Sequence, residues 1–277
     1  MMRMQTSRDP AALERKARWL RRTLFEMMLA ARQGHPGSVL SQVEIVVALY
    51  YAGYIRSSPE SRDRFIVSKG HATMGIYPIL ADLGYFDAAE LAHFGEPGAL
   101  LSAFGHRWIP GIAATTGSLG HGPGIGAGYA LAARGDGADA RIAVLISEGE
   151  LYEGSVWEAA LFAAHQKLDN LVLVIDRNRN IILGDTEELL ALEPLEKKWQ
   201  SFGFRTLRAD GHSFAGLLAA FDQAFVPAGA PTVVIADTVK GKGVAFMEGR
   251  PEWHYWRDPA EAQVAAARRE LAEGARA

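Results

Sequence analysis

Residues 142–180 read IAVLISEGELYEGSVWEAALFAAHQKLDNLVLVIDRNRN. Two short apolar runs, at residues 142–146 and 171–175, flank a stretch of helical character at residues 155–168. Continuous apolar strands that alternate with helices are typical of a parallel sheet that is covered on both faces. This stretch therefore predicts an α/β fold, with a mostly parallel sheet and helices on both of its faces.

The same alternation continues in both directions along the chain. Apolar runs at 65–67 and 232–236 predict two further strands, and helices are expected at 10–32, 42–51 and 124–133. The segment that follows the first helix, Gln-Gly-His-Pro-Gly, is expected to be a loop.

The carboxy-terminal tail differs from the rest of the chain. Asp258 and Pro259 can cap and start a helix that runs through an Ala-rich segment to about residue 272. We therefore expect one α/β domain at residues 1–257 and a peripheral helix at residues 258–277.

The composition excludes several classes of protein. The 277 residues are 49% hydrophobic, which is enough for a sizeable core, and 29 Lys and Arg stand against 32 Asp and Glu. This balance argues against a nucleic acid or an anionic membrane as partner. The chain has no cysteine, which excludes disulfides and thiol catalysis and fits a reducing compartment, so a cytoplasmic location is expected.

Polar side chains follow two of the predicted strands at the point where each strand ends. Glu148 and Asn178 lie just beyond the runs at 142–146 and 171–175, so they would face the same crevice of a parallel sheet. Hard oxygen ligands of this kind suit Mg²⁺ or Ca²⁺. Acidic and Asn residues at strand ends also serve as turn formers or helix caps, and the spacing alone leaves both interpretations open.

The glycine-rich segment at residues 120–128 has two interpretations. It does not match a dinucleotide-binding fingerprint, because Ala127 stands where a third glycine is needed and no apolar strand directly precedes it. Close packing of a helix against its neighbour is favoured, while Gly117, Ser118 and Leu119 form a candidate phosphate-contacting turn.

Five histidines lie beside glycine or proline in expected loops. A single loop histidine is usually solvated, but several that converge at one sheet edge could bind phosphate or carbonyl oxygens and relay protons. They are His35, His71, His106, His121 and His212.

At this point the sequence resembles a known family. Residues 150–178 look like the thiamine diphosphate signature of transketolases. Further matching motifs follow the family's order along the chain, and the closest likeness is to the amino-terminal subunit of split transketolases. These motifs are GHPGS at 34–38, SKGHA at 68–72, TTGSLGHG at 115–122, DGH at 210–212 and TVKGKGVAFMEGRPEWH at 238–254.

The resemblance implies a thiamine diphosphate-binding fold at residues 1–257, with the diphosphate held through Mg²⁺, or through Ca²⁺ or Mn²⁺. The implied metal ligands are the side chains of Glu148 and Asn178 and the carbonyl of Asn180. The implied cofactor contacts are His71, Gly117, Ser118, Leu119, Gly149, Glu150, Asn178 and His254. The histidines implied to line the substrate channel are His35, His71, His106 and His254.

Two acidic residues match positions near the subunit interface of the family. By resemblance, Glu153 and Glu158 would link the two active sites there. The ordinary alternative is that a glutamate on a helix surface is simply solvated.

This chain departs from the family's pattern in two places. Ser147-Glu148-Gly149 replaces the usual Gly-Asp-Gly, so we expect cofactor binding to survive with altered metal and cofactor affinity. Tyr255 and Trp256 replace a small residue and its neighbour after His254. The two aromatics either narrow the substrate channel or pack at the surface.

The resemblance implies transfer of a two-carbon ketol unit from a ketose, or its phosphate, to an aldose. The pyrimidine-binding domain of the family is expected on a separate carboxy-terminal partner subunit, in an α2β2 assembly. The alternatives are one component of a 2-oxo acid dehydrogenase or of a deoxyxylulose-phosphate synthase type of enzyme, or a noncatalytic homologue with weakened cofactor binding.

Overall fold

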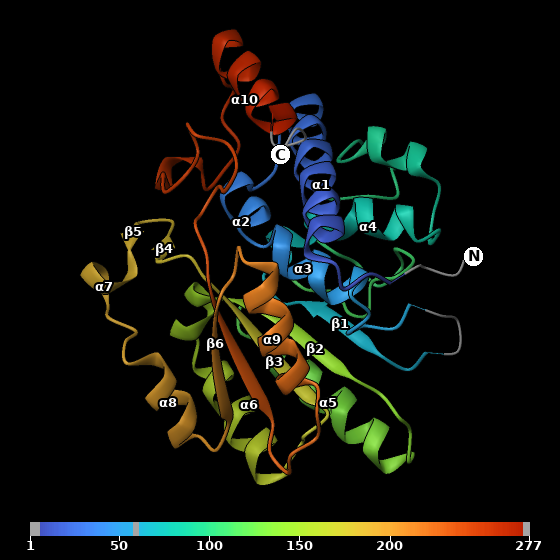
Figure 1. Cartoon of the computed structure of the whole chain (residues 1–277), viewed down its shortest axis with the longest axis vertical. Helices are drawn as coiled ribbons and strands as arrows, with labels where there is room; N and C mark the ends of the chain where they lie inside the picture. The colour runs from blue at the N-terminus through green and yellow to red at the C-terminus, as the bar shows by residue number, and fades with distance from the viewer. Residues whose placement is uncertain (1–5, 58–60, 274–277) are drawn as a thin grey trace.

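A five-stranded, fully parallel sheet forms the centre of the computed structural model, which describes residues 6–57 and 61–273 (Figure 1). The strand order is β1-β2-β3-β7-β6, so the chain crosses over between most neighbouring strands. The strands are β1 (Arg64–Val67), β2 (Ile142–Ser147), β3 (Leu171–Arg177), β6 (Arg205–Asp210) and β7 (Thr232–Asp237).

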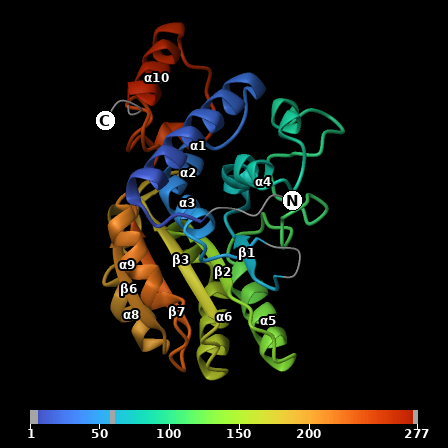
Figure 2. The ribbon, with the colours of Figure 1, turned by 45° about the vertical axis from the view of Figure 1, so that its right-hand side comes forward.

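Helices cover both faces of the sheet (Figure 2). Successive residues of β2 alternate between two apolar clusters: Leu145 packs in one, and Val144 and Ile146 pack in the other. The first cluster includes α1 (Pro10–Ala31), α3 (Val43–Tyr51) and α9 (Phe214–Ala224). The second includes α5 (Gly122–Gly135), α6 (Gly154–His165) and α8 (Leu195–Ser201). Burial on both faces explains why the central strands are continuously apolar.

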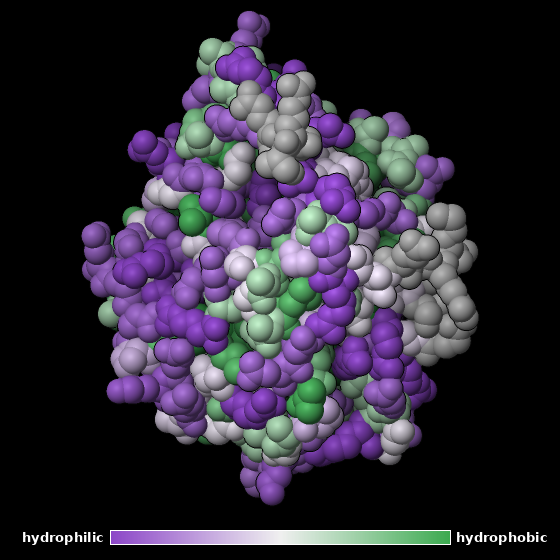
Figure 3. Space-filling view, viewed as in Figure 1, coloured by the Kyte–Doolittle hydropathy of each residue, from purple (hydrophilic) through white to green (hydrophobic). Residues whose placement is uncertain are grey.

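The remaining elements lie around the sheet. They are α2 (Pro36–Ser41), α4 (Tyr77–Asp82), α7 (Thr186–Leu189), the small hairpin of β4 (Asn180–Ile181) and β5 (Gly184–Asp185), and 3₁₀ turns at Gly70–Ile76, Ala88–His93, Glu148–Tyr152 and Pro251–Trp253. On the face shown in Figure 3, hydrophilic residues cover most of the surface, with a small hydrophobic area over α9.

The predicted tail helix is α10 (Glu261–Glu273), which lies alongside α1 (Figures 1 and 2). Ala267 and Leu271 are buried in the same apolar cluster as α1, and Arg268 pairs with Glu26 at 2.8 Å. The helix begins a little after Asp258 and Pro259, and residues 274–277 of the prediction lie outside the described residues.

Most of the predicted elements are confirmed, and two errors have physical reasons. The predicted loop at 33–37 ends earlier than expected, because α2 already begins at Pro36, a residue that suits the first turn of a helix. Strand β6 was not predicted, because Arg205 and Arg208 interrupt its apolar pattern. It is an edge strand, and an edge strand need not be apolar throughout.

The glycine-rich segment leads into α5, and two of the glycines in this helix serve close packing, as predicted. A Cβ on Gly126 would lie 2.4 Å from Cγ2 of Val144 in β2, and one on Gly122 would lie 2.3 Å from Cβ of Ser68. These two positions therefore let α5 approach the sheet closely. Gly124 and Gly128 have room for a side chain.

Within residues 6–57 and 61–273, no helix combines the length and the apolar character needed to cross a membrane.

Candidate active site

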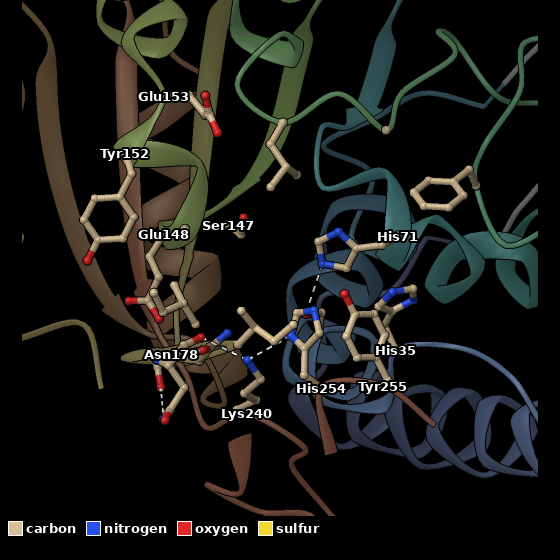
Figure 4. Close-up of a pocket in the computed structure, with 18 residues that line it drawn as sticks. His35, His71, Ser147, Glu148, Tyr152, Glu153, Asn178, Lys240, His254 and Tyr255 are labelled. Carbon is tan, nitrogen blue, oxygen red and sulfur yellow. Dashed lines mark hydrogen bonds between the residues drawn. The ribbon is translucent and has the colours of Figure 1, made fainter. Parts of the chain in front are cut away.

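A cavity of about 460 Å³ lies at the carboxyl edge of the sheet (Figure 4). Residues that follow β1, β2, β3 and β7 line it, together with the start of α2 and the segment at 254–255. This is the edge at which open parallel sheets bind their ligands.

The three candidate metal ligands meet at this cavity. Glu148, Asn178 and Asn180 all line it, because β2 and β3 are paired up to Ser147 and Asp176 and end side by side. Asn178 Oδ1 accepts a hydrogen bond from the backbone N–H of Asn180 at 3.2 Å, which fixes the turn. The proximity expected from the sequence is confirmed, and the roles as ligands remain predictions.

The donor set fits a hard divalent cation. Oε1 of Glu148 is buried and has no hydrogen-bond partner among residues 6–57 and 61–273. Burial raises the pKa of Glu148 to about 6, although the adjacent Arg177 opposes this rise. A carboxylate oxygen, an amide oxygen and a backbone carbonyl are the ligands that Mg²⁺ and Ca²⁺ take in proteins.

Two buried ion pairs lie at the strand ends beside the cavity, and one of them contains Glu148 itself. Lys69 pairs with Asp176, and both side chains are 0% exposed. Arg177 pairs with Glu148, and both side chains are 1% exposed. Burial disfavours the charged form of Asp176, but Lys69 and hydroxyl donors outweigh this effect and hold its pKa below the usual value.

Lys240 lies in the motif at residues 238–254 and lines the cavity, although the sequence does not predict it as a ligand. It is 1% exposed and donates to the Asn180 carbonyl at 3.0 Å (Figure 4). Burial lowers its pKa to about 8. Within the described ranges, no carboxylate lies within ion-pair distance of its ammonium group. A buried cation that faces a cavity in this way favours an anionic ligand.

Three of the four predicted channel histidines cluster at the cavity. The ring centroids of His35 and His71 are 4.9 Å apart, and each lies 5.6 Å from the ring of His254. His71 Nε2 lies 3.2 Å from Ser38 Oγ, a second cavity residue that was not predicted.

These histidines are neutral near pH 7. Burial, helped by the charge of Lys240, lowers the pKa of His35 to about 4, and the same causes lower that of His254 to about 4. Burial also holds the pKa of His71 well below its usual value. Neutral imidazoles can both donate and accept hydrogen bonds, which suits recognition of hydroxyl and carbonyl groups.

His106 is not among the residues that line the cavity. Its ring stacks on Trp108 with a centroid distance of 4.0 Å and an interplanar angle of 7°. The position of His106 therefore does not support a role in the substrate channel.

The predicted cofactor contacts fall into two groups. Gly117, Leu119 and Gly149 line the cavity, whereas Ser118 and Glu150 do not. Gly117 has φ +153°, a conformation that favours glycine.

Glu150 instead supports the loops from below. It is fully buried, and it accepts hydrogen bonds from the backbone N–H of Gly120 at 3.0 Å and of Ser147 at 2.8 Å. It also accepts a bond from the Ser68 hydroxyl. The Glu150 carboxylate thus holds the 115–122 loop against the ends of β1 and β2.

The two predicted interface glutamates separate. Glu153 is exposed and lines the cavity, whereas Glu158 is exposed on α6 and does not line it. For Glu158 the position fits the ordinary interpretation of a solvated helix residue.

The two aromatic residues after His254 have different surroundings. Tyr255 lines the cavity, is 54% exposed, and lies 5.1 Å from the His35 ring by centroid. Trp256 packs against Phe25 and Trp253, each with a ring-centroid distance of 6.4 Å, and its backbone N–H donates to the Gly34 carbonyl. Tyr255 thus forms part of the cavity wall, and Trp256 anchors the segment.

The fold and this cavity define a class of protein: an α/β domain whose cavity, at the carboxyl edge of its sheet, suits an anionic ligand bound together with a divalent cation. More specifically, the chain belongs to the transketolase family, since the family model described as transketolase, thiamine diphosphate binding domain, matches residues 14–273. The family and the cofactor predicted from the sequence are confirmed by this match.

Individual relatives agree with this assignment. The chain is 40% identical to an apulose-4-phosphate transketolase subunit of Actinobacillus succinogenes, over 88% of this chain and 90% of the relative. It is 37% identical to the 6-deoxy-6-sulfo-D-fructose transketolase subunit SqwG of Clostridium sp. (strain MSTE9), over 95% of this chain and 98% of the relative.

A solved structure shows the same fold. The transketolase of Campylobacter jejuni superposes with a TM-score of 0.87 at 28% identity, covering 95% of this chain and 43% of the solved chain. The chain therefore spans less than half the length of this transketolase.

Proposed function

We propose that this chain is the amino-terminal subunit of a thiamine diphosphate-dependent transketolase that moves a two-carbon ketol unit from a ketose to an aldose. The observation that carries the proposal is the cavity, which gathers hard oxygen donors, the buried Lys240 and three neutral histidines. The family match and the relatives support transketolase over the other thiamine diphosphate enzymes.

Glu148, Asn178 and the Asn180 carbonyl would hold the divalent cation, and Lys240 would bind the diphosphate. Gly117, Leu119 and Gly149 would contact the cofactor through backbone atoms, since they line the same cavity. When bound, thiamine diphosphate supplies the carbon nucleophile that accepts the ketol unit.

His35, His71 and His254 would orient the sugar. Their rings surround one side of the cavity, and their lowered pKa values keep them neutral, so each can donate one hydrogen bond and accept another. A neutral imidazole can also accept the proton that a hydroxyl loses as it becomes a carbonyl, and the imidazolium so formed can return it.

A carboxy-terminal partner subunit would complete the site. Both relatives described above are named as subunits and are matched over 90% and 98% of their own length. Cavity residues Phe104, Ile182 and Tyr255 are 40%, 45% and 54% exposed, so the cavity has an apolar rim on which a partner can pack. We propose an α2β2 assembly with two cofactor sites, which a sedimentation measurement on the mixed subunits would test.

The substrates would be specialised sugars or sugar phosphates. The two relatives are named for apulose 4-phosphate and for 6-deoxy-6-sulfo-D-fructose. Tyr255 lines the cavity beside His35 and His254, so it would restrict which sugars enter.

We also propose the boundaries of the cofactor-binding domain. Residues 1–257 would form the cofactor-binding domain and residues 258–277 its peripheral helix, in a protein of the cytoplasm. The family match ends at residue 273, which is the last residue of α10.

The experiment is a ketol-transfer assay with the chain, its carboxy-terminal partner, thiamine diphosphate and Mg²⁺, over a panel of ketose donors and aldose acceptors. Cofactor-dependent transfer supports the proposal. If the mixture binds thiamine diphosphate but transfers no ketol unit from any donor, the chain is instead a noncatalytic homologue.

A further inference from the structure

Arg177 is a charged side chain buried beside the candidate metal ligands. It is 1% exposed, and so is its neighbour Glu148. The two residues come from adjacent strand ends, since Ser147 and Asp176 are the last paired positions of β2 and β3. Charged groups are rarely buried to this degree unless they are paired.

The Arg177 guanidinium contacts carboxylates from two directions. Its Nη1 pairs with Oε2 of Glu148 and donates to Thr186 Oγ1 at 2.8 Å. Its Nη2 donates to Glu187 Oε1 at 2.7 Å and lies 3.5 Å from Glu193 Oε1. Because Thr186 and Glu187 belong to α7, Arg177 fixes Glu148 against this short helix.

This contact makes the two oxygens of Glu148 unequal. Oε2 is held by Arg177, whereas Oε1 is buried and lacks a hydrogen-bond partner in the described part of the chain. Glu148 has one methylene more than the aspartate of the transketolase signature. Its carboxylate therefore extends further from the backbone than that of an aspartate. Arg177 compensates for this length by binding Oε2, which leaves Oε1 available to a cation.

Positive side chains flank the oxygens that would hold a divalent cation. Arg177 shares its charge among Glu148, Glu187 and Glu193, whereas the buried Lys240, which donates to the Asn180 carbonyl at 3.0 Å, has no carboxylate within ion-pair distance among the described residues. Like charges a few ångströms apart repel strongly in a buried site. A divalent cation alone therefore gains little here, whereas a cation that arrives with a diphosphate brings compensating negative charge.

We propose that Arg177 is a positioning residue that holds Glu148 as a single-oxygen ligand, which weakens binding of a divalent cation that arrives without the diphosphate. This inference rests on the proposed function, because it concerns the same cofactor. Arg177 would thereby compensate for the longer side chain of Glu148, which stands where the transketolase signature has an aspartate.

Binding of Mn²⁺ to the full 277-residue chain, followed by electron paramagnetic resonance, tests this. The wild type should bind Mn²⁺ weakly alone and at least about tenfold more tightly with thiamine diphosphate. Arg177→Met should raise the affinity for Mn²⁺ alone on the order of tenfold and reduce its dependence on thiamine diphosphate. Arg268→Met, which breaks an exposed pair with Glu26 on α10, should change neither quantity.

Glu148→Asp is the second variant, and it decides the question alone if Arg177→Met does not fold. Its shorter carboxylate is released from Arg177, so the affinity for Mn²⁺ alone should rise as well. An unchanged or lower affinity in either folded variant overturns the inference and leaves the proposed function standing. If the wild type binds no Mn²⁺ even with thiamine diphosphate and the partner subunit, both are overturned.

Discussion

At the scale of single residues, Lys240 makes the most direct prediction. Replacing it by Met should weaken thiamine diphosphate binding on the order of 10- to 100-fold, because a hydrogen bond from a charged group contributes about 1.5–3 kcal/mol. Titration calorimetry with Mg²⁺ and the partner subunit present measures this. Lys242→Met, in the same loop but 38% exposed, should bind like the wild type. Equal losses in both variants would contradict the role of Lys240.

The charge of Lys240 also gives the site a pH dependence. Burial lowers its pKa to about 8, so the ammonium is charged below that pH and loses its proton as the pH rises through it. Affinity for thiamine diphosphate should therefore be steady between about pH 6, the pKa of Glu148, and about pH 8, and it should fall above pH 8, since binding then requires a proton. The Lys240→Arg variant, which keeps its charge, should show a flatter profile.

The sequence predicted which loops meet at the site better than it predicted which side chains face the cavity. Strand order and strand ends brought together the predicted residues His35, His71, Gly117, Leu119, Glu148, Gly149, Glu153, Asn178, Asn180 and His254. The direction of a side chain within a loop depends on how it packs in three dimensions, and the hydrophobic pattern of the sequence does not show this packing. For this reason Glu150 points inward instead, and Lys240 and Arg177 were not predicted as parts of the site.

At the scale of secondary structure elements, the approach of α5 to the sheet depends on Gly126. A Cβ there would lie 2.4 Å from Val144 Cγ2, whereas Gly128 on the same helix has open space. Gly128→Ala should stabilise the chain by about 1 kcal/mol through helix propensity. Gly126→Ala should be less stable than Gly128→Ala by about 1–3 kcal/mol because of overpacking. Urea unfolding of both variants measures this, and equal stabilities would contradict the close packing.

The pair of Lys69 and Asp176 ties the end of β1 to the end of β3. Lys69→Met leaves Asp176 buried without its cation, which should cost about 3–5 kcal/mol of unfolding free energy. Lys16→Met, which breaks a surface pair with Asp82, should cost about 0–1 kcal/mol. Chemical denaturation at pH near 7 compares the two variants.

The sign of the pH effect gives a further check on this pair. In the wild type the pKa of Asp176 lies below its usual value, so its stabilising contribution is lost only as the pH falls through that low value. Without Lys69, burial should raise the pKa of Asp176 above its usual value, so the loss in stability should shrink toward acidic pH. A loss that does not change with pH would contradict the assignment.

Predictions of the elements succeeded where burial alone decides the pattern. The runs in β2, β3 and β7 are continuously apolar because both faces are covered, so they are visible in the sequence. Strand β6 lies at the sheet edge with Arg205 and Arg208 partly exposed, so it lacks this pattern. Tertiary contacts, which are absent from a single segment, decide its conformation.

At the scale of the whole molecule, the chain presents a cofactor cavity with an exposed apolar rim. The rim includes Tyr255 and Phe104, and the cavity opens at the carboxyl edge of the sheet. Relatives matched over nearly their whole length are named as subunits. The central claim is therefore that this chain holds the diphosphate end of the cofactor and becomes active with a carboxy-terminal partner.

The most direct test is to titrate the partner subunit into a fixed amount of this chain and to record the rate of ketol transfer, with thiamine diphosphate and Mg²⁺ in excess. The account predicts no transfer without the partner, a rise with each addition, and a plateau at equal amounts of the two subunits. Full transfer by this chain alone, or none at any ratio, would contradict it.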